Sequence, residues 1–187
     1  MVKKIVLTVV ILGLAGGGFF YWWQGHADER ALNKTLPEGI RVDKCLLSGE
    51  YRVINKIDGY EFKVPEEWKG VKEIGYIPER EEMGYTGTSL NLEGRESSGR
   101  LIGIDRFNSG GDMNTDLELW AKTQSDTFGL VGGFSKDEIG GFKIVKTQEN
   151  VHFGGEYTYF FKQDRVIYSI TGPSEEFIKE IILNGKW

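Results

Sequence analysis

The pattern most typical of a chemical site is Asp112-x-Asn114-x-Asp116, which has the spacing that opens an EF-hand calcium loop. The pattern then fails, because Leu117 stands where the loop requires glycine and Thr123 where it requires glutamate. A helix start explains the same residues more simply, since acidic side chains suit the positive end of a helix. Asp112, Asn114 and Asp116 remain candidate metal ligands under the alternative interpretation.

Two histidines limit the catalytic options. His26 follows the apolar N-terminal stretch, and His152 begins a predicted strand. A Ser-His-Asp triad would depend on His152, and no Gly-x-Ser-x-Gly turn is present to expose a serine. The glycine pairs have no Gly-Lys-Ser/Thr sequence, so no phosphate-binding loop of the P-loop type is expected. We therefore predict no catalytic residues and no cofactor.

The overall composition excludes other classes of protein. The 187 residues are 40% apolar and carry a net charge of −5. A nucleic-acid-binding protein normally has a basic stripe that neutralises phosphates, and none is present, so we expect no nucleic-acid partner. Cys45 is the sole cysteine, which rules out an intramolecular disulfide and a multi-cysteine zinc site. We expect it to have no function, and the alternative is a redox-active or dimer-forming thiol.

The N-terminal segment is the most apolar part of the chain. After Lys3 and Lys4, residues 5–23 carry no charge and are long enough to approach the roughly 30 Å of a bilayer core. The closing aromatic residues suit a membrane interface. We predict a single-pass anchor over residues 1–23 with the rest of the chain extracytoplasmic. The alternative is a signal peptide cleaved near Ala27, after which the protein is secreted.

The segment that follows is polar, and we expect residues 24–50 to form a linker that holds the domain away from the membrane. Hydrophobic alternation and turn signals then predict successive strands in the domain of residues 51–187. The predicted strands are 51–56, 60–64, 71–77, 86–92, 100–107, 142–147, 152–162 and 165–171.

Two helices are expected between and after these strands. Thr115 and Glu118 have capping-box spacing, and apolar residues recur at helical intervals up to Phe128. Ser174 has the position of an N-cap for a second helix that ends near Gly185. Short connections between successive strands require antiparallel pairing. The sequence therefore predicts an α+β fold, with a largely antiparallel sheet and helices on its faces.

The domain resembles the PsbP family, the extrinsic proteins of photosystem II and their bacterial relatives. Residues 59–68 are similar to the opening pattern of glycine, aromatic strand, proline and tryptophan of that family. Residues 140–145, 157–162 and 166–171 resemble its central strands, and 177–187 its closing helix and aromatic end. The resemblance implies an α/β/α sandwich and a non-enzymatic role in binding or stabilising a membrane complex. The matching motifs contain no binding residues to transfer.

These observations lead to one preferred function and two alternatives. We expect a membrane-tethered, extracytoplasmic module that binds or assembles a protein partner in a membrane or envelope complex. The alternatives are a carboxylate- or metal-dependent hydrolase and a sensor of a cation or small ligand. A pocket with two buried carboxylates, or with His152 beside an acid, would favour the hydrolase.

Overall fold

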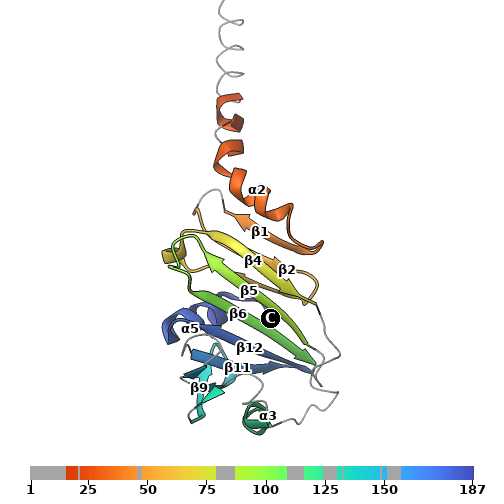
Figure 1. The fold of residues 1–187 in the computed structure, drawn as a ribbon, viewed down its shortest axis with the longest axis vertical. Coiled ribbons are helices and arrows are strands. Elements are labelled where there is room, and N and C mark those ends of the chain that lie inside the picture. The colour runs from red at the N-terminus through yellow and green to blue at the C-terminus, as the bar shows by residue number, and fades with distance from the viewer. Residues whose placement is uncertain are drawn as a thin grey trace, which may run out of the picture.

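The computed structural model describes residues 16–20, 22–45, 48–78, 87–108, 116–123, 130–131, 133–147, 149–150 and 157–187. In this part of the chain every strand pair is antiparallel. The largest sheet has seven strands (Figure 1) in the order β4 (Val71–Ile77), β5 (Gly87–Gly94), β6 (Leu101–Asn108), β12 (Val166–Gly172), β11 (Tyr157–Gln163), β9 (Phe142–Thr147) and β8 (Ser135–Ile139).

The remaining described elements are smaller. A three-stranded sheet contains β1 (Ile40–Lys44), β2 (Tyr51–Asn55) and β3 (Tyr60–Lys63), and a short ribbon pairs β7 (Leu130–Val131) with β10 (Glu149–Asn150). The helices are α2 (Ala27–Asn33), the 3-10 turn η1 (Glu66–Trp68), α3 (Leu117–Thr123) and α5 (Glu175–Asn184).

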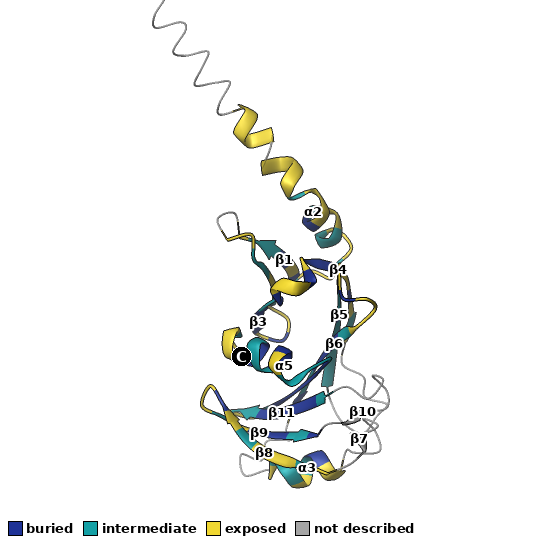
Figure 2. Ribbon diagram, turned by 90° about the vertical axis from the view of Figure 1, so that its left-hand side faces the viewer, coloured by how far each residue is buried: buried dark blue, intermediate teal, exposed yellow. Residues whose placement is uncertain are grey.

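One face of the large sheet, here named the core face, supplies most of the hydrophobic core. Alternate strand residues that project from it are apolar and fully buried: Leu90, Leu92, Ile102, Ile104, Ile170, Tyr159 and Phe161. The three-stranded sheet and α5 both pack on this face (Figure 2). Ring contacts join the layers, with centroids 4.8 Å apart for Trp68 and Phe177 and 6.1 Å apart for Tyr60 and Tyr168.

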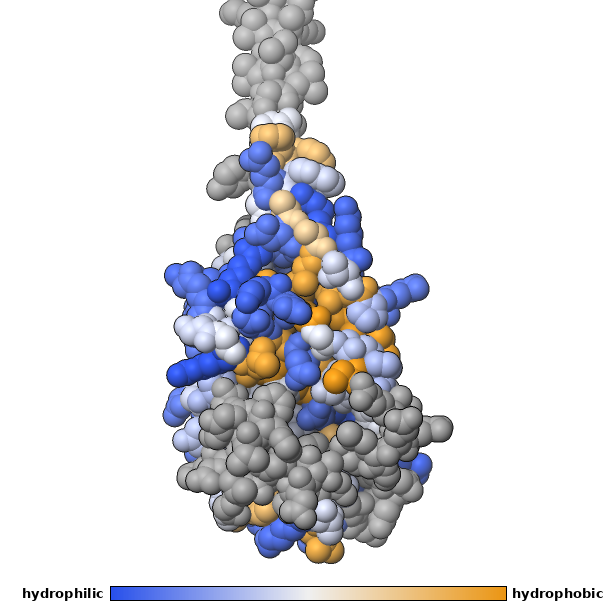
Figure 3. Space-filling model, in the orientation of Figure 1, coloured by the Kyte–Doolittle hydropathy of each residue, from blue (hydrophilic) through white to orange (hydrophobic). Residues whose placement is uncertain are grey.

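The opposite face of the large sheet, here named the α3 face, has a much smaller apolar cluster. Ala121 of α3 is buried against Val145 and Phe160 of the sheet, with Leu117 and Trp120 packed around them. Figure 3 views the molecule from this side and shows hydrophilic and apolar residues interspersed on it. The two faces of one sheet therefore differ sharply in polarity.

Helix α5 forms as the sequence predicts. The Ser174 hydroxyl accepts a hydrogen bond from the Phe177 amide at 3.3 Å and so caps the helix. The apolar stripe is buried. Trp187 folds back: its indole N–H donates to the Ile182 carbonyl at 3.2 Å, and its ring lies 5.3 Å from that of Tyr168. The helix thereby closes the core face.

The structure corrects the predicted fold class. The large sheet is not sandwiched between two helical layers, because the three-stranded sheet shares the core face with α5 and only the seven-residue α3 among the described helices packs on the other face. The described protein is mainly β, with two stacked antiparallel sheets. The prediction of an α/β/α sandwich is wrong because residues 40–44, read as linker, add a strand to the hairpin that follows them.

The predicted N-terminal transmembrane helix is also corrected. No helix within the described residues is long and apolar enough to cross a membrane. Of the predicted span over residues 5–23, residues 5–15 and 21 lie outside the description, and the described remainder continues into the charged helix α2. The single-pass membrane localisation is overturned with it. Ala27, near which the alternative placed a cleavage site, begins α2.

The segment expected to be a linker is instead attached to the domain. Ile40 and Val42 of β1 are buried, and β1 pairs with β2 along its length. The Asn33 side chain donates to the Val42 carbonyl at 2.8 Å and accepts from the Val42 amide at 2.7 Å. The Asn33 side chain thus makes the same two hydrogen bonds that the backbone of a neighbouring strand would make, and it fixes α2 to the outer edge of β1.

Candidate functional site

The structure assigns a structural role to the one described residue of the predicted calcium motif. Asp116 accepts hydrogen bonds from the amides of Glu118 at 2.9 Å and Leu119 at 3.0 Å, so its carboxylate caps α3. Asp112 and Asn114 lie outside the described residues, as does His152. Within the described ranges no three His, Cys, Asp or Glu residues gather to hold a metal ion. Cys45 is exposed just after β1 and is not in a disulfide.

Asp116 does, however, line a groove between α3 and the sheet. The groove has a volume of about 910 Å³ and is open to solvent. Its walls come from the start of α3, from β8 and β9 and from the end of β11: Asp116, Leu117, Glu118, Lys136, Asp137, Gly141, Phe142, Lys143, Ile144, Val145, Lys162 and Asp164. Segments distant in the chain therefore meet at one surface.

The floor of the groove is apolar because α3 packs on the sheet there. Val145 is buried, and Leu117 is partly buried beside the groove. The centroid of the Trp120 ring lies 6.0 Å from that of Phe160, and this contact holds α3 against the sheet. Burial of these rings stabilises the position of α3 and keeps the groove open alongside it.

Charged side chains line the rim. Glu118 accepts from Lys122 at 2.5 Å and from Lys136 at 2.8 Å, and these two hydrogen-bonded ammonium groups lower the pKa of Glu118 to about 2. The exposed side chain of Lys143 carries a further positive charge on the rim. A general acid needs a raised carboxyl pKa, so the carboxylate of Glu118 is suited to charge recognition instead.

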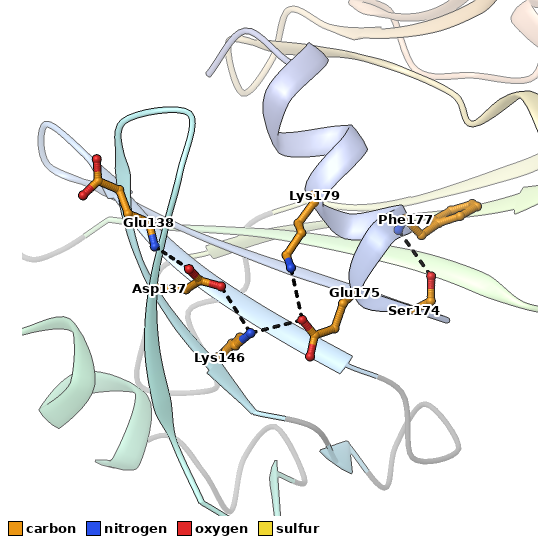
Figure 4. Close-up of polar contacts among 7 residues, drawn as sticks. All are labelled: Asp137, Glu138, Lys146, Ser174, Glu175, Phe177 and Lys179. Carbon is orange, nitrogen blue, oxygen red and sulfur yellow. Dashed lines mark hydrogen bonds and ion pairs between the residues drawn. The ribbon is translucent and has the colours of Figure 1, made fainter.

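An ion-pair network lies next to the groove and joins it to α5 (Figure 4). The ammonium group of Lys146 on β9 lies 3.2 Å from Asp137 of β8 and 3.1 Å from Glu175 of α5. Glu175 also accepts from Lys179 one turn later, at 3.3 Å. The network ties the first turn of α5 to the last two strands of the sheet.

The pKa values in this network indicate a structural role. Burial tends to lower the pKa of Lys146, but hydrogen bonds to Glu175 and Asp137 raise it above its ordinary value. The Tyr159 hydroxyl and Lys146 lower the pKa of Glu175, and the Glu138 amide and Lys146 lower that of Asp137. A nucleophilic lysine needs a lowered pKa, so Lys146 is a permanent cation that holds the edge strands in place.

Sequence reasoning did not identify the groove. Residues 142–147 were predicted as a strand, but nothing in their pattern shows that a helix lies beside them. The capping residue was also misplaced, because the structure uses Asp116 where the sequence suggested Thr115, which lies outside the described residues. The signal that could have located the groove is the Gly140-Gly141 turn, where both residues have positive φ and the chain reverses.

Comparison of the chain with protein-family models, curated proteins and solved structures finds no match. The resemblance to the PsbP family stays a prediction that depends on the sequence passages quoted above.

Proposed function

We propose that this protein is a non-catalytic binding domain that holds a segment of a protein partner in the groove beside α3. The observation that carries the proposal is the combination of an apolar floor with a charged rim whose pKa values are unsuited to acid–base chemistry. Protein interfaces commonly have this arrangement, with a hydrophobic centre and a polar rim. The domain then serves as an assembly or stabilising module in a larger complex.

The groove also suits such a partner in its dimensions. Its volume of about 910 Å³ is near the upper limit of small-ligand pockets, roughly 300–1,000 Å³, but those pockets enclose their ligands. An open groove instead accommodates side chains that project from a longer segment. We expect apolar partner side chains over Leu117 and Val145 and acidic ones near Lys143.

The hydrolase and cation-sensor alternatives are not proposed. Two described carboxylates at the groove, Glu118 and Asp137, accept from ammonium and amide groups that lower their pKa. Asp116 is already occupied by the helix cap. These residues therefore support recognition of charge better than proton transfer.

Site-specific crosslinking tests the proposal. A photoreactive residue at Lys143, on the rim, should capture one discrete partner in cells, whereas the same residue at Lys56, an exposed lysine in the β2–β3 turn, should not. Lys136→Glu should reduce the Lys143 adduct about fivefold, equivalent to roughly 1 kcal/mol of interface energy. Lys34→Glu, a charge reversal at the residue that follows α2, should leave the Lys143 adduct unchanged. Equal adducts from both positions, or an adduct insensitive to Lys136→Glu, would refute the proposal.

A further inference from the structure

A row of polar side chains crosses the middle of the α3 face. Asp105 on β6 is paired directly opposite Ser89 on β5 and directly opposite Ser169 on β12. Side chains of opposed residues in antiparallel strands project from the same face, with Cβ atoms roughly 5 Å apart. Asn91 follows Ser89 by two residues in β5, so its side chain projects from the same face. Register alone therefore brings four polar groups together.

Two of these groups have no hydrogen-bond partner. Ser169 is 1% exposed and its hydroxyl is unsatisfied, and the Asn91 side-chain oxygen is unsatisfied as well. Nearby hydroxyls do find partners, since Thr158 and Thr171 lie 3.0 Å apart. An unsatisfied buried polar group destabilises a fold, so a pair of them beside one carboxylate points to a place where a hydrogen-bonding ligand would be stabilised.

Asp105 supplies a negative charge that is not balanced in the described structure. Burial raises the pKa of its carboxyl to about 6, while a hydrogen bond from Ser89 tends to lower it. No ion pair to Asp105 occurs among the described residues. The adjacent Arg106 projects to the core face, in the row of Tyr168. At neutral pH the carboxylate is ionised, and no cation among the described residues pairs with it.

Aromatic side chains lie next to the row. Phe160 is paired opposite Ser169, and Phe107 follows Asp105 by two residues on the same face. Trp120 of α3 joins them, with its ring 5.3 Å from that of Phe107 and 6.0 Å from that of Phe160. Aromatic rings beside a carboxylate attract organic cations, which gain from both the charge and the ring faces.

We propose that Ser89, Asn91, Asp105 and Ser169, here named the Asp105 site, bind the ammonium group of a small primary amine. An ammonium group offers three N–H donors to the Asp105 carboxylate, the Asn91 oxygen and the Ser169 hydroxyl. Ser89, Asn91 and Asp105 are partly exposed as residues, whereas the Asn91 oxygen and the Ser169 hydroxyl are themselves buried, so the ammonium group enters past Ser89 and Asp105 to reach them.

Other ligands fit these residues less well. Calcium takes six to eight oxygen ligands, and the Asp105 site has a single carboxylate. An anion would be repelled by Asp105, and a neutral alcohol would leave the carboxylate charge unbalanced. The site lies on strands β5, β6 and β12, which do not line the groove beside α3, so the two proposals can fail independently.

The test is a titration followed by the amide signals of Ser89, Asp105 and Ser169 in an ¹⁵N-labelled full-length protein at pH 7.5. The probes are n-butylammonium, 1-butanol and butyrate, which share a chain and differ in charge, and calcium and magnesium ions. We expect saturable shifts with n-butylammonium alone. Lowering the pH through 6 should weaken its binding, because the carboxylate becomes protonated.

Variants locate the effect. Asp105→Asn should weaken n-butylammonium binding by about tenfold to a hundredfold, the worth of a hydrogen bond to a charged group, and Ser169→Ala by a smaller factor. Asp43→Asn removes a solvent-accessible aspartate of β1, in the other sheet, and should leave the affinity for n-butylammonium unchanged. If Asp105→Asn does not fold, Ser169→Ala and the pH series still decide. Equal binding of 1-butanol, saturation by a divalent ion at these signals, no binding of the amine, or unchanged affinity in the variants would overturn the proposal.

Discussion

Removing the charge of Asp105 should stabilise the protein at neutral pH. Its pKa is about 6 in the folded protein, against an ordinary value of 3.8. A factor of ten in a protonation equilibrium is worth about 1.36 kcal/mol, so the ionised carboxylate costs the folded state about 3 kcal/mol at pH 7.5. Asp105→Asn removes that cost while keeping the shape of the side chain.

The direction of the pH dependence follows from the raised pKa. Below about pH 3 the carboxyl is protonated in both the folded and the unfolded chain, and its favourable contribution to stability is complete. That contribution is lost as the pH rises through 6. The stability difference between Asp105→Asn and the parent protein should therefore grow by about 3 kcal/mol between pH 3 and pH 7.5.

Urea denaturation at a series of pH values, without added amine, measures this difference directly. Asp137→Asn is the matched control, because the pKa of Asp137 is lowered by the Glu138 amide and by Lys146. Its carboxylate stabilises the folded state above the unfolded pKa, so this variant should lose stability as the pH rises. A pH-independent difference for Asp105→Asn would show that the carboxyl is not buried as described.

Three further substitutions test one close packing contact and two sets of hydrogen bonds. Gly94→Ala would place a Cβ 2.4 Å from the Trp68 ring, and we expect a loss of about 1–3 kcal/mol in urea denaturation. Asn33→Ala removes both hydrogen bonds to Val42 and should lower the local stability by about 1–2 kcal/mol, measured as faster hydrogen exchange at α2; unchanged exchange would contradict the role given to Asn33. Asp116→Ala should destabilise α3 by about 1 kcal/mol, measured by the same exchange method.

Hydrophobic alternation predicted the strands whose two ends are marked by turns. Residues 142–147 were expected as a strand and form β9 with the same bounds, and Ser174 caps α5 as expected. Other strands carried weaker signals. Ile40 and Val42 alternate with charged residues but were read as linker, and β8 has only Ile139 as a buried apolar residue. Strand β8 forms because β9 offers it a pairing edge, which no local pattern reveals.

The polar residues of the Asp105 site could not be grouped from sequence. Ser89, Asp105 and Ser169 lie on three separate strands, and each is an ordinary polar residue in its own segment. Only the register of β5, β6 and β12 places them in one row. Periodicity indicates which face a residue occupies, whereas strand order and register, set by contacts across the whole domain, decide its neighbours.

The two hydrogen bonds between Asn33 and Val42 have a consequence for self-association. Strand β1 is the edge of its sheet, and an exposed edge offers free N–H and C=O groups to a second copy of the same strand. The Asn33 side chain occupies the N–H and C=O groups of Val42, so α2 covers this edge and hinders edge-to-edge aggregation. Proteolysis between α2 and β1 would allow α2 to detach and expose the edge of β1. The cleaved protein should therefore aggregate faster than the intact chain, although its core is unchanged.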